Sequence, residues 1–142
     1  MRSLFQKNGP LLFLSILLLT ACAALRPGPV PVSENPAVLM LVEQARAEAA
    51  DNKLQSAVAT IERAQRLEPR NPWLWQELAR LHMALGNHAQ AESLAARSNT
   101  WAGGDRLLHA ANWRLIGVAR AARGDAPGAQ AAEARAAELE SR

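Results

Sequence analysis

Few side chains in this 142-residue chain are suited to catalysis or metal binding. Its three histidines, His82, His88 and His109, fall in separate segments and lack the short spacings that hold a metal ion. Cys22 is the one cysteine, so an internal disulfide is excluded. Gly103-Gly104 lacks the preceding strand and the phosphate-loop pattern of a nucleotide site. We therefore expect no enzyme, no catalytic residue, no metal and no cofactor.

Cys22 instead has the surroundings of a lipid attachment site. Arg2 and Lys7 precede an apolar run at 11–19, which is typical of a secretory signal and shorter than the roughly 20 residues of a spanning helix. Leu19-Thr20-Ala21-Cys22 resembles the bacterial lipobox, which implies a mature chain beginning at Cys22 with a stable anchor of more than one acyl chain. Ala23 rather than Asp follows the cysteine, and the known sorting rule then implies the outer membrane, with the domain facing the periplasm. The alternative is a plain secreted protein with an incidental cysteine.

The composition predicts an all-α protein behind a short tether. Once a signal segment 1–21 is removed, 14 basic residues (16 less Arg2 and Lys7) balance 13 acidic ones, and no basic stripe interleaved with aromatics remains, so nucleic acid is not an expected partner. The 30 alanines, the few β-branched residues and the absence of Tyr favour helix throughout. Residues 22–35, rich in Pro and Gly, predict an extended tether about 40 Å long.

The stretch from Trp75 to Ala91 predicts a helix, a turn and a second helix. Trp75, Leu78 and His82 recur at three- and four-residue steps, so they share one helix face. Gly86 is placed to end that helix, because glycine enters the left-handed conformation at little cost. This spacing resembles a tetratricopeptide repeat, a 34-residue helix-turn-helix unit with Trp, Leu, Gly and Ala at fixed places.

The same pattern occurs in three units, at about 38–71, 72–105 and 106–142, within a repeat domain at 36–142. Val38 begins the first unit, 34 residues before Pro72, and Ala110 occupies the matching place in the third. The larger spacing to Ala110 predicts a first helix lengthened at its N-terminal end. The resemblance implies a short right-handed solenoid of three repeats, with Trp75 and Trp113 in its core.

In this family the first helix of each repeat lines a concave groove that binds peptides or a partner helix. Carried over by position, the groove residues here would be Leu39, Val42, Arg46, Trp73, Gln76, Glu77, Arg80, Met83, Ala111, Arg114, Leu115 and Val118. Trp and Arg are strongly enriched at binding hot spots. Trp73 alternatively packs beneath the Asn71-Pro72 turn. Trp101, on a Gly-flanked loop, is either a partner contact or a cover over the gap before the third repeat.

The arginines of this groove allow two interpretations. Arg46 and Arg80 occupy equivalent places in successive repeats and are able to fork onto a partner's carboxylate. Alternatively, they pair with Glu43 and Glu77 or lie on a solvated face. The Lys and Asn residues with which some family members grip a C-terminal carboxylate are absent, so that clamp is not expected.

Together these features predict an adaptor that is held at the membrane by its N-terminal lipid and binds an envelope protein. The lipobox, the short Pro-rich tether and the small repeat array resemble the lipoprotein activators of bifunctional peptidoglycan synthases, the class A penicillin-binding proteins. That resemblance implies a penicillin-binding protein as the partner, stimulated on binding. The alternatives are a pilotin or assembly chaperone for a type IV pilus secretin, whose known members are longer, and a general envelope scaffold.

Overall fold

The computed structural model of the chain describes residues 32–141. The signal segment, Cys22 and the tether as far as residue 31, all assigned from the sequence, lie outside the described residues. The repeat domain belongs to one compact unit, Pro31–Arg142. Within the described part of the chain, no helix is both long and apolar enough to cross a membrane.

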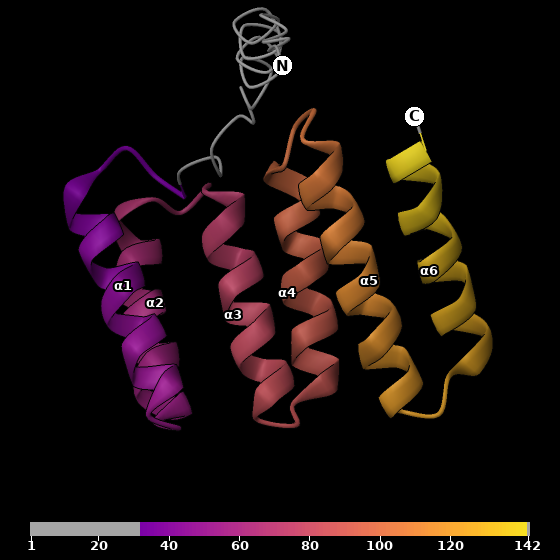
Figure 1. Cartoon of the computed structure of the whole chain (residues 1–142), viewed down its shortest axis with the longest axis horizontal. Helices are drawn as coiled ribbons and strands as arrows, with labels where there is room; N and C mark the ends of the chain where they lie inside the picture. The colour runs from indigo at the N-terminus through magenta and orange to yellow at the C-terminus, as the bar shows by residue number, and fades with distance from the viewer. Residues whose placement is uncertain (1–31, 142) are drawn as a thin grey trace, which may run out of the picture. The chain divides into compact units, whose positions relative to one another are not determined.

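Six α-helices and no strands make up residues 32–141, which confirms the all-α prediction. Consecutive helices run antiparallel and stand side by side as three hairpins in a row (Figure 1). The third hairpin begins with a helix of 17 residues, the longest of the six, as the larger spacing to Ala110 predicted. The helices are α1 (Pro36–Ala50), α2 (Leu54–Leu67), α3 (Pro72–Ala84), α4 (His88–Trp101), α5 (Arg106–Ala122) and α6 (Ala126–Ser141).

Side-chain caps define where four of the helices begin. Asn35 and Asn71 each accept a hydrogen bond from a backbone N–H of the first turn, and a proline follows each of them. Asp105 accepts from the N–H of Leu108 at the start of α5. Asp125 accepts from the N–H of Gly128 at the start of α6. Each cap satisfies a backbone donor that the helix itself leaves open.

Within each hairpin, the turn is made by one residue in the left-handed conformation. These residues are Asn52 (φ 60°), Gly86 (φ +76°) and Gly124 (φ +83°). The sequence predicted the turn at Gly86, and all three residues are of the types, glycine and asparagine, that enter this region at the least cost.

Small residues allow the helices to approach closely. Ala57, Ala64, Ala91 and Ala95 have no exposed surface, and each lies on the inner side of the second helix of a hairpin. In α5, Gly117 is so near α6 that an added Cβ would lie 3.3 Å from the carbonyl oxygen of Ala129. Trp75 and Trp113 are half-buried against the core, in agreement with their assignment to it.

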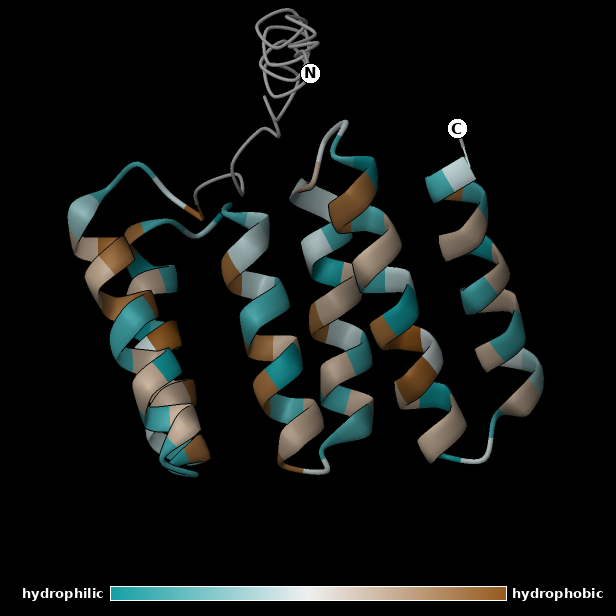
Figure 2. Ribbon diagram, viewed as in Figure 1, coloured by the Kyte–Doolittle hydropathy of each residue, from teal (hydrophilic) through white to brown (hydrophobic). Residues whose placement is uncertain are grey.

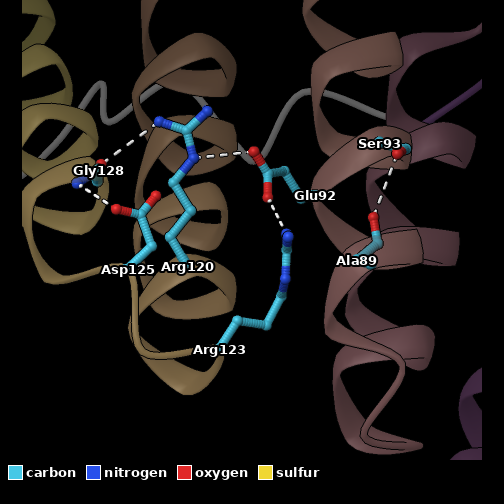
Figure 3. Close-up of polar contacts among 7 residues, drawn as sticks. All are labelled: Ala89, Glu92, Ser93, Arg120, Arg123, Asp125 and Gly128. Carbon is cyan, nitrogen blue, oxygen red and sulfur yellow. Dashed lines mark hydrogen bonds and ion pairs between the residues drawn. The ribbon is translucent and has the colours of Figure 1, made fainter.

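An ion-pair cluster joins the second hairpin to the third. Glu92 of α4 accepts from Arg120 Nε at 2.8 Å and from Arg123 at 2.7 Å (Figure 3). Figure 3 also shows Asp125 capping α6 beside this cluster, with Arg120 reaching the carbonyl of Gly128. Because Glu92 and Arg120 are only partly exposed, solvent screens this cluster less than it screens a fully exposed pair.

Candidate protein-interaction groove

The first helices of the three hairpins, α1, α3 and α5, carry all the residues assigned to the groove. We call the surface they form the groove face. A small cavity of about 40 Å³ lined by Arg46, Ile61, Glu77 and Leu81 shows that α1 and α3 share it. Exposed on this face are Leu39, Arg46, Arg80, Arg114 and Val118. Half-buried are Trp73, Glu77, Met83, Ala111 and Leu115.

Two of the assigned groove residues are buried, which corrects their expected position. Val42 is 1% exposed and belongs to the core, because the inner stripe of α1 packs against α2. Gln76 is 3% exposed, and its Nε2 donates to Asn112 Oδ1 at 3.0 Å. Neither side chain presents a surface to a partner, since each is enclosed by its own neighbouring helices.

Gln76 belongs to a buried polar network that the sequence analysis did not find. Asn112 of α5, with no exposed surface, donates to Ser98 Oγ at 2.7 Å and to Asn99 Oδ1 at 2.9 Å. Ser98 in turn donates to the carbonyl of Pro72 at 2.8 Å. The network joins α3, α4 and α5 across the junction of the last two hairpins. Its signal in the sequence was a polar residue, Asn112, at a repeat position that Leu74 fills in the second repeat.

The arginines of the groove face differ in whether they have partners. Arg46 pairs with Glu43 at 2.8 Å and with Glu77 of α3 at 3.5 Å, as one of the two sequence interpretations expected. Arg80, by contrast, makes no ion pair within residues 32–141. The groove face therefore offers a partner one uncompensated guanidinium in α3.

Arg114 of α5 is held by two glutamates of α6. It donates to Glu140 with both terminal nitrogens and lies 3.5 Å from Glu133. The hydrogen bond to Glu140, followed by the attraction of that carboxylate, raises the pKa of Arg114 above its ordinary value. The positive charge of Arg114 is thus largely compensated before any partner arrives.

Trp73 and Trp101 lie near the loop ends of the helices. Trp101 is the last residue of α4, which corrects its expected position on a loop. Trp73 is half-buried and lines an open cleft of about 530 Å³ together with Val32 and the turn 68–72. Trp101 is 38% exposed, and the guanidinium of Arg70 lies 5.3 Å from its ring centroid. Both rings retain accessible surface, which is what a partner contact requires.

Two of the three histidines, His82 and His109, make local polar contacts. His82 Nδ1 lies 3.3 Å from the side-chain amide of Asn87 at the turn between α3 and α4. His109 reaches Asn99 with Nδ1 and the carbonyl of Gly103 with Nε2. Among the described residues, no group of three or more His, Cys, Asp and Glu side chains is arranged to hold a metal ion.

Comparison with known proteins identifies the family of this fold. The tetratricopeptide repeat family model matches residues 48–112, and no curated protein matches the chain. The globular C-terminal domain of P. aeruginosa LpoP is 38% identical, with a TM-score of 0.71 over 73% of this chain and 98% of that domain. The tetratricopeptide domain of Sgt2 from Aspergillus fumigatus is 23% identical, with a TM-score of 0.68 over 81% of this chain and 74% of that one. MamA is 18% identical, with a TM-score of 0.67 over 74% of this chain and 59% of that one.

These likenesses differ in what they show. The similarity to Sgt2 and MamA concerns the fold alone, because fewer than a quarter of the aligned residues are identical. The similarity to the LpoP domain includes the sequence and extends over nearly the whole of that domain. This chain therefore belongs to the tetratricopeptide-repeat family, together with the globular domain of LpoP.

Proposed function

We propose that this protein is a lipid-anchored adaptor of the cell envelope that binds and stimulates a class A penicillin-binding protein. The observation that carries the proposal is the 38% identity to the LpoP domain across 98% of its length. The lipobox at Cys22 and the Pro-rich tether support it from the sequence, by their resemblance to the lipoprotein activators of these synthases. The protein lies at the outer membrane, with its repeat domain in the periplasm.

The groove face is the surface through which the synthase is bound. Arg80 receives a carboxylate of the partner, because its guanidinium is exposed and makes no ion pair within the described residues. Met83 and Val118 supply apolar surface on the same face. Arg46 and Arg114 contribute less, since binding there must compete with the glutamates that already hold them. Stimulation follows if the bound domain stabilises the active conformation of the synthase.

The test measures binding and glycan-chain polymerisation with the purified lipidated protein and purified class A penicillin-binding proteins of the same cell. The wild-type chain raises the polymerisation rate of one of them. Arg80→Glu weakens binding by about tenfold or more, because it replaces a free cation with a repelling charge. Arg46→Glu has a smaller effect. Arg106→Glu, which makes the same charge change off the groove face, serves as the matched control.

Three results separate the proposal from its alternatives. Absence of any rate change with every class A synthase of the cell would refute the proposed function. Equal losses for Arg80→Glu and Arg106→Glu would move the binding surface away from the groove face. Photo-crosslinking in cells from position 73, with position 101 in parallel, identifies the neighbour directly. A secretin subunit in the adduct would replace the synthase with the pilotin alternative.

A further inference from the structure

The outer face of α1 has the geometry of a helix-docking surface on which no helix of residues 32–141 packs. Met40 occupies the repeat position that Leu74 takes in α3 and Asn112 takes in α5. Leu74 and Asn112 have no exposed surface, whereas Met40 is 73% exposed. In the second and third repeats, the second helix of the preceding repeat packs on the first helix: α2 packs on α3, and α4 packs on α5. Among the described residues, no helix precedes α1 (Figure 1).

This face is apolar and hollowed. Eight residues line a groove of about 760 Å³ between α1 and α2: Ala37, Leu39, Met40, Leu41, Glu43, Gln44, Arg63 and Leu67. Glu43 is paired with Arg46, so its charge is already compensated. Leu67 is 52% exposed, and Leu39 is exposed as well. Three of the six large hydrophobic side chains exposed within residues 32–141 therefore gather in one groove. Figure 2 shows the corresponding hydrophobic bands on α1. We call this surface the N-terminal face.

A single unpaired cation borders the N-terminal face. Arg63 occupies the repeat position of Arg97, whose guanidinium stacks 4.8 Å from the centroid of Trp75, and of Arg135, which pairs with Glu138. Leu41 stands where the second repeat has Trp75, so Arg63 has no ring to stack on. Arg63 also makes no ion pair within residues 32–141. An occupant of the groove with a carboxylate at this edge would complement the charge of Arg63.

The last helix of a second copy is not suited to this groove. In α2, Ile61 meets both α1 and α3, because it lines one cavity with Arg46, Glu77 and Leu81. The equivalent residue of α6 is Glu133, whose side chain is 60% exposed and pairs with Arg114. Docking α6 onto α1 would bury this carboxylate where α1 has Glu43 and Ala47 in place of Glu77 and Leu81, which is costly. The exposed side of α6 thus carries charged residues, whereas the exposed side of α1 is apolar.

We infer that the N-terminal face binds an amphipathic α-helix of another protein, in the position that α2 and α4 take on the later repeats. The bound helix places an apolar stripe with i, i+3/i+4, i+7 spacing against Leu39, Met40 and Leu67. It carries a carboxylate that pairs with Arg63. This surface shares Leu39 alone with the groove face, and the inference does not depend on which protein binds at the groove face.

The test uses the full-length chain in the cells that produce it, with a photoreactive residue at position 40. The control carries the same residue at position 134, which is exposed on α6. The cross-linked segment of the partner is mapped and synthesised as a peptide, and its affinity for the purified chain is measured by fluorescence anisotropy. Met40→Glu and Arg63→Glu each weaken peptide binding by about tenfold or more. A peptide whose acidic residue is changed to Lys regains affinity for Arg63→Glu.

The outcomes divide clearly. A position-40 adduct with a segment of that apolar spacing, together with charge-swap rescue, supports the inference. An adduct formed only with a second copy of this chain overturns it, as does a non-helical segment or an adduct no stronger than that from position 134. Met40 and Arg63 are exposed, so the thermal melts of both variants stay close to wild type and loss of binding is not loss of folding.

Discussion

Asn112 shows how a single polar residue can fix the register of two repeats. Its side chain donates to Ser98 and Asn99 and accepts from Gln76, so it joins three helices without any exposed surface. The equivalent position in the second repeat holds an apolar residue, Leu74. Hydrogen bonds are directional, so this junction tolerates less sliding than an apolar contact of the same size.

We expect Asn112→Ala to lower the free energy of unfolding by about 2–3 kcal/mol, since it leaves buried partners unsatisfied and opens a small cavity. Gln76→Leu combined with Asn112→Leu should cost less than the sum of the two single changes, because it removes both partners together. Urea unfolding followed by circular dichroism measures each variant. Additive losses would show that the two side chains are not energetically coupled.

Gly86 allows a matched test of the turn between α3 and α4. An added Cβ at Gly86 or at Gly104 meets no atom within 4 Å, but only Gly86 has a positive φ, +76°. Gly86→Ala should therefore lower the free energy of unfolding by about 1–2 kcal/mol, the cost of the left-handed conformation for a residue with a Cβ. Gly104→Ala should leave the melting temperature nearly unchanged. Equal effects of the two substitutions would contradict the backbone explanation.

At the scale of elements, α1 and α2 are joined by a carboxylate. Glu48 of α1 accepts from Thr60 of α2 at 2.8 Å and from Gln44 within α1 at 2.9 Å. The hydrogen bond from Gln44, followed by that from Thr60, lowers the pKa of Glu48 below its ordinary value. Because the folded-state pKa is the lower one, ionised Glu48 stabilises the hairpin above its unfolded-state pKa. This contribution is lost as the pH falls through the folded-state pKa.

Glu48→Gln should therefore destabilise the protein at neutral pH, and its difference from wild type should shrink on acidification. Urea melts of both proteins from neutral pH to about pH 3 follow this change, since ordinary carboxylates titrate over that range. Glu62→Gln makes the same charge change at an exposed site of α2 and serves as the control. A difference that persists at acid pH would assign the loss to packing rather than to the charge of Glu48.

The two ends of the array differ at the scale of the whole domain. α6 closes one end with Glu133 and Glu140, both paired with Arg114. At the other end, Met40 of α1 and Leu67 of α2 are exposed. A solenoid needs polar terminal faces to stay soluble alone, and the exposed apolar face is the basis of the proposed helix-binding site. The groove face and the N-terminal face then allow the domain to meet more than one segment of its surroundings.

Attachment to the membrane is a further prediction at this scale. Cys22→Ser should block acylation and move the protein from the membrane fraction to the periplasmic fraction, because the anchor supplies the membrane affinity. Fractionation of detergent-free lysates followed by immunoblotting measures the change. Ser33→Ala, beyond the lipobox, should leave the protein with the membrane. A Cys22→Ser protein that stays in the membrane fraction would show that the lipid is not what holds it there.

The sequence was most informative about the ends of the helices, which local backbone conformation determines. The structure confirms the helix end predicted at Gly86 and the turn predicted at Asn71-Pro72, and Asp105 marks a helix start in the same local way. These residues act through local conformation and nearby backbone donors, so their effect is readable within a few positions of the chain. Alanines at the repeat spacing similarly identified the inner side of each second helix.

Assignment of the groove by repeat position was less complete. It placed Arg80 and Val118 on an exposed surface, but it also included Val42 and Gln76, which are buried. Repeat position tells which helix a residue lies on, whereas exposure depends on how neighbouring helices cover it. Repeat position therefore identified the helix that carries each residue, and the exposure of its side chain only in part.

By itself, then, the sequence determined the all-α class, the repeat family and the ends of the helices, because these depend on local propensity and on the spacing of small and apolar residues. Only the tertiary structure decided which charges remain available. Arg46 is paired with Glu43 of its own helix and Glu77 of α3, and Arg114 with glutamates of α6, whereas Arg80 and Arg63 make no ion pair within residues 32–141. The spacing of residues along one helix does not show which side chains of other helices lie near it, because packing across the whole array sets those distances.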